Sequence, residues 1–146
     1  MSFSFFGVIS LIILIISAAA LIIHHNVVKV RASLDQYMMQ FEELLHDRLE
    51  IIIEIAEELK QPSICEACEA YLNADTREIT KAWAKIEKIT APIKEELNKA
   101  LTENAQEIDV VVTGYNGLAD AYNNRISKLP GRLIAYIVGL EAVKEL

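Results

Sequence analysis

Residues 5–23 read FFGVISLIILIISAAALII, a run of nineteen residues without a charge and with serine as its only polar side chain. As an α-helix this run is about 28 Å long, which matches the hydrocarbon thickness of a bilayer. A helix buried in a soluble protein keeps one polar face, and this run has none. The whole chain of 146 residues is 53% hydrophobic and has a mean hydropathy of +0.26, high for a soluble domain. We therefore expect a transmembrane helix within residues 1–23.

A cleaved signal peptide is the alternative interpretation of this run, because Ala18–Ala20 offer a small-residue cleavage site. Two features favour a retained span. No Lys or Arg precedes the run, and Leu21–Ile23 extend it past the alanines, where a signal peptide becomes polar. Lys29 and Arg31 follow the span closely, so the positive-inside rule predicts an outside N-terminus and a cytoplasmic helical domain in a cell membrane.

Two long stretches with seven-residue spacing of apolar side chains follow the span, at residues 24–60 and 93–129. Neither Gly nor Pro occurs between residues 24 and 61, so the span is expected to continue directly into the first stretch. Four series carry the spacing: Val27, Leu34, Phe41, Arg48, Ile55; Arg31, Met38, Leu45, Ile52, Leu59; Leu97, Asn104, Val111, Leu118, Arg125; and Leu101, Ile108, Tyr115, Tyr122, Leu129. Such spacing is typical of coiled-coil-like packing, and stretches of equal length can bury each other's apolar stripe.

These patterns predict an all-α fold, in which an N-terminal transmembrane helix continues into a long antiparallel helical hairpin or bundle with short connecting helices. The expected organisation is a transmembrane segment at 1–23, a helical bundle at 24–129 and an apolar C-terminal tail at 130–146. Gly114 and Gly117 predict a kink or break in the second stretch. Residues 133–140 read LIAYIVGL, too short to cross a bilayer, and are expected to lie on the hairpin or in the membrane interface.

Turn and capping signals divide the region between the two stretches. Pro62 is expected to close the first helix, and Ser63 with Glu66 has the spacing of a capping box for a short helix that ends near Leu72. Asp75 with Glu78 repeats this spacing, which predicts a second short helix to about residue 89.

Two arginines, Arg31 and Arg48, interrupt the apolar series of the first stretch and are expected to have acidic partners. In an antiparallel arrangement Arg48 faces Glu103 or Glu107, and Arg31 faces Asp120 or Asn123. An unpaired guanidinium in an apolar seam costs several kcal/mol, so we expect structural polar pairs that fix the register.

Basic residues gather at the membrane-proximal end of the expected hairpin, while the distal end is acidic. The expected collar consists of Lys29, Arg31, Arg125, Lys128 and Arg132. Each basic side chain near an anionic leaflet contributes about 1 kcal/mol of attraction, so the collar would steady the helical domain on the cytoplasmic face.

The residues that suggest chemistry have simpler structural explanations. Cys65 and Cys68 form a CxxC, but a zinc site needs two further ligands and a thioredoxin-like motif needs a βαβ setting, so two reduced thiols are expected. Glu43 and His46 form the single Glu-x-x-His, where a di-metal bundle needs two. No catalytic motif occurs, and the net charge of −7 argues against nucleic acid. We expect no catalytic residue, cofactor or metal.

The C-terminal stretch resembles the LemA family of membrane proteins. The family pattern YNxxVxxYNxxIxxFP is similar to YNGLADAYNNRISKLP at residues 115–130, and its LIAxxxG tail is similar to residues 133–139. Residues 25–31 and 48–52 look like the family's YNxLVxLR and RxDLI segments. The sequence departs from the family at Ile53, Glu54 and Val112, where the family has Pro, Asn and Arg. The resemblance implies a single-pass membrane protein with a helical bundle and no agreed biochemical activity.

The sequence therefore predicts a membrane-anchored helical scaffold without enzymatic activity. Its expected partners are the lipid bilayer and either further copies of itself or a membrane or cytoplasmic protein. The alternative is an accessory or regulatory subunit of another membrane machine, such as a protease or transporter. An enzyme is a third class, for which Glu43 and Cys65 would be the residues to substitute.

Overall fold

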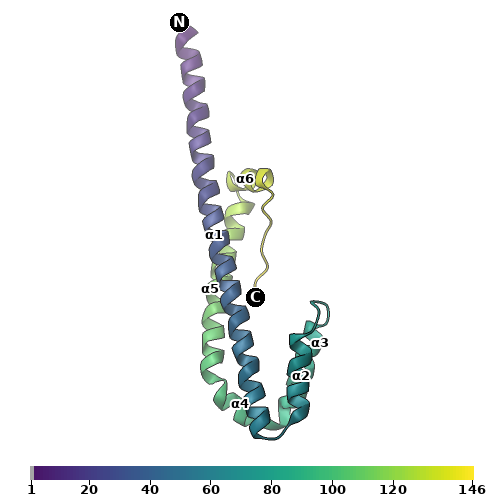
Figure 1. The fold of residues 1–146 in the computed structure, drawn as a ribbon. Coiled ribbons are helices and arrows are strands. Elements are labelled where there is room, and N and C mark those ends of the chain that lie inside the picture. The colour runs from purple at the N-terminus through teal and green to yellow at the C-terminus, as the bar shows by residue number, and fades with distance from the viewer. Residues whose placement is uncertain (1) are drawn as a thin grey trace. The chain divides into compact units, whose positions relative to one another are not determined.

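The computed structural model describes residues 2–146 and their side chains from Phe5 on, and these residues form helices without a strand (Figure 1). The all-α prediction is therefore confirmed. The elements are α1 (Ser2–Glu58), α2 (Pro62–Leu72), α3 (Ile79–Thr90), the 3₁₀ turn η1 (Ala91–Ile93), α4 (Lys94–Ala100), α5 (Thr102–Ser127) and α6 (Gly131–Val138).

Helix α1 is unbroken over 57 residues, as expected from the lack of Gly and Pro after Gly7. At 1.5 Å per residue its length is about 85 Å. It ends in a Schellman motif, in which Lys60 has φ 54 and the Gln61 and Lys60 N–H groups donate to the Ala56 and Glu57 carbonyls. The prediction that Pro62 closes this helix is wrong. Pro62 is the first residue of α2, where its missing N–H costs nothing.

The two predicted capping boxes are not formed either. The N-cap of α2 is Gln61 and that of α3 is Glu78, and neither makes a side-chain capping bond. Asp75 instead accepts a hydrogen bond from the Thr76 N–H in the turn before α3. In α2, Pro62 fixes the starting backbone angle, which leaves less need for a side-chain cap.

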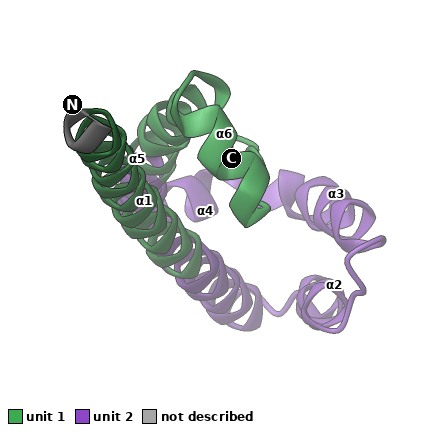
Figure 2. Cartoon of the chain, turned by 90° about the horizontal axis from the view of Figure 1, so that it is seen from above, with its two compact units in different colours: residues 1–39, 112–146 green, residues 40–111 purple. Residues whose placement is uncertain are grey.

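The chain forms two compact units, coloured separately in Figure 2. Unit 1 contains residues 1–39 and 112–146, and unit 2 contains residues 40–111. Both long helices, α1 and α5, contribute to both units. The boundaries expected at residues 23 and 129, between the transmembrane segment, the helical bundle and the tail, stay a prediction.

Unit 1 is held together by the packing of α1 on α5. Its buried core consists of Val27, Leu34, Tyr115, Ala119, Tyr122, Ile126 and Ala135. The Arg31 guanidinium lies over the Tyr122 ring, and further along α1 the Tyr37 ring lies against Gly114. Since higher numbers on α1 face lower numbers on α5, the two helices run antiparallel in this unit.

Unit 2 packs the end of α1 against α2, α3, α4 and the start of α5. Its buried core consists of Leu49, Ile52, Ala56, Ile64, Ala67, Cys68, Ile86, Leu97 and Leu101. Tyr71 of α2 and Trp83 of α3 meet edge to face, with ring centroids 5.5 Å apart. The short connecting helices α2 and α3 are therefore part of a small helical cluster with its own buried core.

Within the two long stretches the seven-residue spacing finds most of the buried positions, but it misses Leu49, Ala56, Ala119 and Ile126 and includes two positions that lie beyond helix ends. Leu59 and Leu129 are exposed, because α1 ends at Glu58 and α5 at Ser127. The break in the second stretch comes at Leu101, between α4 and α5, and α5 passes through Gly114 and Gly117 without interruption.

Helix α6 returns the chain to unit 1. Gly131 is buried, and a Cβ there would overlap the Arg125 carbonyl oxygen, so only glycine fits this position. The helix packs Ala135 into the core and leaves Leu133, Tyr136 and Ile137 exposed. Gly139 ends it at φ 71, a left-handed conformation that favours glycine. The expected contact of the tail with the hairpin is therefore present on one face of α6.

Alanine substitutions of Gly114 and Gly117, both in the middle of α5, distinguish the effect of helix propensity on stability from the effect of packing. An added Cβ at Gly117 has no neighbour within 4 Å, so Gly117→Ala is expected to raise the unfolding free energy by about 0.5–1 kcal/mol. At Gly114 the Cβ would lie 2.8 Å from Tyr37 Cε1, so the ring must move and Gly114→Ala gains less or destabilises. Thermal unfolding in detergent, followed by circular dichroism, measures both. Equal stabilisation by the two variants would contradict the close packing of Tyr37 on α5.

Candidate functional site

The last residues of the chain, 140–146, contain no helix and are held to α5 by two asparagine side chains. Asn123 Nδ2 donates to the Val143 carbonyl at 2.8 Å, and the Val143 N–H donates to Asn123 Oδ1 at 2.9 Å. Asn116 does the same with Leu146, at 3.3 and 2.8 Å. Each amide therefore gives one residue of the tail the donor and acceptor that a neighbouring β-strand would give.

The spacing of the two asparagines matches the rise of an extended peptide. Seven residues of helix from Asn116 to Asn123 advance about 10.5 Å. Three residues of extended chain from Val143 to Leu146 advance about 10 Å. Since Asn123 pairs with Val143 and Asn116 with Leu146, the tail runs antiparallel to α5. We call Asn116 and Asn123 the asparagine ladder.

Tyr122 adds a third polar contact beside the ladder. Its side chain is fully buried in the core of unit 1, and its hydroxyl donates to the Glu141 carbonyl at 3.2 Å. A buried phenol needs such a partner, because an unsatisfied polar group costs free energy. The tail thus completes the hydrogen bonding of a core residue as well as that of the ladder.

Side chains of the tail contribute at only a few positions. Leu140 and Val143 pack against the core of unit 1, whereas Glu141, Ala142 and Lys144 are exposed. The site therefore binds the main chain of the tail through amides and packs apolar side chains at two positions, Leu140 and Val143.

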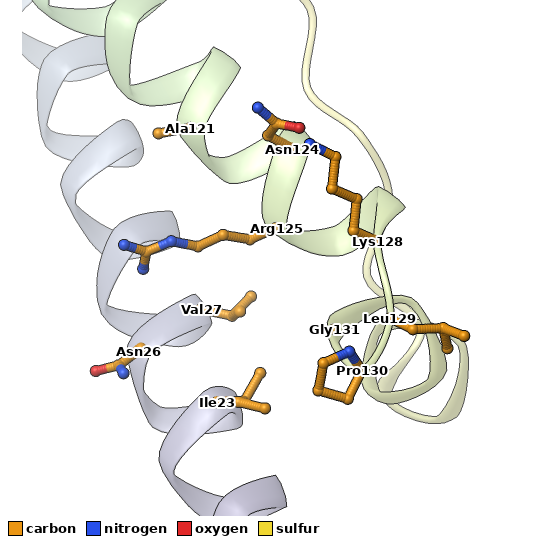
Figure 3. A pocket seen from close by; sticks show the side chains of 10 residues that line it. All are labelled: Ile23, Asn26, Val27, Ala121, Asn124, Arg125, Lys128, Leu129, Pro130 and Gly131. Carbon is orange, nitrogen blue, oxygen red and sulfur yellow. The ribbon is translucent and has the colours of Figure 1, made fainter.

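A cavity of about 560 Å³ lies in unit 1 near the end of the apolar part of α1 (Figure 3). Its lining residues are Ile23, Asn26, Val27, Ala121, Asn124, Arg125, Lys128, Leu129, Pro130 and Gly131. The Arg125 side chain reaches from α5 toward α1, and Lys128 folds back toward Asn124 (Figure 3). An apolar wall with two cations at its rim suits an anionic group that carries an apolar chain.

The structure brings together part of the expected basic collar. Arg125 and Lys128 line this cavity, and Lys29 and Arg132 are exposed elsewhere in the same unit. Arg31 is engaged within the protein. Its Nε lies 3.7 Å from Asp35 Oδ1, and its guanidinium lies 6.0 Å from the centroid of the Tyr122 ring.

The expected ion pairs of the two seam arginines are not formed. Arg31 pairs with Asp35 one turn along its own helix, where side chains four residues apart meet without help from α5, and Asp120 is exposed. Arg48 Nη1 lies 3.4 Å from Asn104 Oδ1, a hydrogen bond to the residue next to the expected Glu103. The register prediction thus comes within one residue on α5, but the partner is a neutral amide.

Asn104 is the buried polar residue of unit 2. Its Nδ2 donates to the Leu44 carbonyl at 2.9 Å while its Oδ1 accepts from Arg48. Both halves of the amide are used, so the buried group is satisfied. Glu103 and Glu107 lie instead beside Glu43 and Asp47 around a cavity of about 640 Å³ in the same unit.

The CxxC lies on α2 as two free thiols. Cys65 is half-buried and Cys68 is buried in the core of unit 2. Burial raises the pKa of the Cys68 thiol to about 11, with a further contribution from the nearby Cys65. A thiol with a raised pKa is a poor nucleophile and a poor metal ligand near neutral pH.

Metal ligands do not gather elsewhere in the chain from residue 5 on, where no group of three or more His, Cys, Asp or Glu side chains could hold an ion. His46 of the Glu-x-x-His pairs with Glu50, at 3.5 Å and exposed to solvent, rather than with Glu43.

Comparison with known proteins adds no relative. No protein-family model, curated protein or solved structure matches the chain.

The asparagine ladder is the part of the site that the sequence patterns did not predict. Its signal is the dipeptide Tyr-Asn, which occurs at 115–116 and again at 122–123. The seven-residue interval puts both amides on one face of α5 beside two buried tyrosines. The seven-residue interval between the two Tyr-Asn dipeptides can be seen in the sequence. The segment that binds to the asparagines cannot, because residues 140–146 have no periodic pattern.

Alkylation should distinguish the two thiols. In the native protein, iodoacetamide at pH 7–8 is expected to modify Cys65 well before Cys68, and Cys68 should react only as the pH approaches 11. Because the folded state holds the Cys68 proton more tightly, this thiol's contribution to stability is complete below its ordinary pKa of 9.0 and is lost as the pH rises toward 11. Peptide mass spectrometry reports both sites, with denatured protein as the control for equal reactivity. Faster labelling of Cys68 at neutral pH would refute this assignment.

Proposed function

We propose that the chain is a single-pass membrane protein of the LemA type, a helical scaffold without catalytic activity. In this proposal residues 5–23 span the bilayer and the remainder of the chain lies on the cytoplasmic side. The observation that carries the proposal is the exposure of the apolar part of α1. Large apolar side chains from Phe5 to Ile22 are 38–70% exposed, and the best 18-residue window, with a mean hydropathy of 3.0, has no buried share.

An exposed apolar surface of this extent is unfavourable in water. Monomeric soluble proteins rarely expose contiguous apolar patches above a few hundred Å², and a helix that is apolar on every side exceeds that limit. Because the helix satisfies its own backbone hydrogen bonds, hydrocarbon can replace water around it at no cost in unpaired N–H groups. A bilayer is therefore the environment that this segment fits best.

The orientation rests on the basic residues that follow the apolar segment. No Lys or Arg precedes it, and Lys29, Arg125 and Lys128 belong to the same unit as its end. The cavity lined by Ile23, Arg125 and Lys128 would meet anionic headgroups where the span leaves the hydrocarbon. Attraction of about 1 kcal/mol for each such side chain favours the cytoplasmic leaflet.

The role as a scaffold rests on what unit 1 does with its polar residues. Three of the four residues in the two Tyr-Asn pairs that carry the LemA resemblance, Asn116, Tyr122 and Asn123, hold a peptide segment through neutral amides and a buried phenol. Neutral amides bind and position main chain and are not acids, bases or nucleophiles, and the Tyr122 hydroxyl is engaged by the Glu141 carbonyl. Protein binding at a membrane is thus the function that this arrangement supports.

Charge placed inside the apolar segment should detach the protein from membranes. The variant Leu14→Arg with Ile15→Arg adds two cations at the centre of the span, each at a cost of about 2.5–3.5 kcal/mol. Met39→Arg with Gln40→Arg adds the same charge to exposed positions of α1 beyond the span. After extraction with alkaline carbonate, the wild type and the control should stay in the membrane pellet. The Leu14/Ile15 variant should leave it.

The intact mass of the protein from the same preparation shows whether residues 1–20 are retained as a membrane span or removed as a signal sequence. The proposal requires the first twenty residues to be present. A mature chain that lacks them, or complete release of the wild type by carbonate, would overturn it.

A further inference from the structure

We propose that the asparagine ladder is a binding site for an extended peptide, and that the C-terminal segment 140–146 of a second copy can occupy it in place of the chain's own. This inference deepens the proposed function, since it names the contact by which anchored copies associate, and it rests on that function for the shared membrane plane.

The chemistry of the ladder selects main chain rather than a particular sequence. Asn116 and Asn123 each donate to a carbonyl and accept from an N–H of the same tail residue. Any residue except proline at those two positions offers this pair of groups. The remaining requirement is an apolar side chain at the positions of Leu140 and Val143, which pack on the core of unit 1.

The occupant in the structure is held in a way that permits exchange. Apart from the bond from the Leu140 N–H that caps α6, the hydrogen bonds of residues 140–146 go to side chains of α5: Asn116, Tyr122 and Asn123. Most side chains of the segment are exposed. Gly139, at φ 71, ends α6 immediately before the segment and provides a glycine at the point where the direction of the chain would have to change.

A second copy is the occupant that this geometry favours. Its segment is identical, so it matches the ladder by construction, and each copy that gives up its tail leaves an identical empty site. Exchange of identical elements in this way closes a two-fold dimer. Copies anchored in one membrane also meet at a high effective concentration.

The reach of the segment gives a second, independent reason. Val143 lies four positions after Gly139, a distance of about 13 Å in an extended chain. Exchange therefore brings the ends of two α6 helices close to the same ladder. Helix α6 carries an apolar face that no part of its own chain covers, formed by Leu133, Tyr136 and Ile137, with Tyr136 86% exposed. A second copy would cover this face.

Photocrosslinking of the full chain in nanodiscs tests the exchange. Ala142 is exposed and lies beside Asn123, Asn124 and Ser127 around one cavity, so p-benzoylphenylalanine at position 142 should crosslink to the 123–127 region of α5. Equal amounts of ¹⁴N-labelled and ¹⁵N-labelled protein are mixed before reconstitution. We expect crosslinked peptides that combine both isotopes. Exclusively same-isotope peptides would show that each tail stays on its own chain, and would overturn the proposal.

Two sets of variants show whether the ladder is responsible for the mixed crosslinks. Asn116→Asp with Asn123→Asp replaces each donating amide by a carboxylate that can only accept, and faces it with a carbonyl oxygen. Mixed crosslinks should fall about tenfold or more, because two hydrogen bonds are lost and two repulsive contacts are added. Gln106→Glu is the matched control, because it makes the same change from amide to carboxylate at an exposed position of α5 outside the ladder.

The second set changes only the tail, so a folding defect in α5 cannot explain its effect. Val143→Pro removes the N–H that Asn123 accepts, whereas Lys144→Pro removes an N–H that makes no bond to the ladder. The first should abolish mixed crosslinks and the second should retain them. Equal yields for the two variants would refute recognition through the main chain.

The outcomes separate this inference from the membrane proposal. A wild type that resists carbonate but gives no mixed peptides overturns the exchange alone. A wild type that carbonate releases, but that still gives ladder-dependent mixed peptides at high concentration, overturns the anchor alone.

Discussion

The structure depends on one constraint, which is that α1 is a single helix whose first part is apolar and exposed on every side and whose later part is packed against other helices. From Phe5 to Ile22 its side chains touch little protein, and from Val27 on they form the buried seam of unit 1. An α-helix satisfies its own backbone throughout, so the same element can serve in both environments without a break. The lack of Gly and Pro from residue 8 to residue 61 is the sequence feature that allows this.

Three asparagines of α5 have the same role, which is to bind backbone groups of other segments with their side-chain amides. Asn104 binds the Leu44 carbonyl within unit 2, and Asn116 and Asn123 bind the tail within unit 1. An amide can satisfy a donor and an acceptor at once without carrying charge, which avoids the desolvation cost of an ionised group. This explains why the partner of Arg48 on α5 is the amide of Asn104 rather than the expected Glu103 or Glu107.

The sequence predicts the elements with strong periodicity and misses those that depend on local geometry. The seven-residue spacing predicts the buried positions at which α1 and α5 pack, because helix packing repeats at that interval. These positions include Val27, Leu34, Tyr115 and Tyr122. The break at Leu101 and the left-handed Lys60 do not, because neither residue type disfavours a helix interior. The asparagine ladder was not predicted, for a different reason. Its partner is an extended segment whose position is set by tertiary contacts, although the Tyr-Asn repeat itself was present in the resemblance to LemA.

The accessibility of nitroxide labels along the apolar helix tests the central claim most directly. Single cysteines at successive positions from 8 to 30, in a Cys65→Ser, Cys68→Ser background in nanodiscs, are labelled and probed with oxygen and with a nickel chelate. A spanning helix predicts that oxygen collisions rise smoothly to a maximum near Leu14 and that the nickel chelate reaches labels only from about His24 on and near the N-terminal end. A profile that oscillates every 3.6 residues would instead describe a helix lying in the membrane surface, and nickel access along the whole stretch would place it in water. Either result would contradict the account.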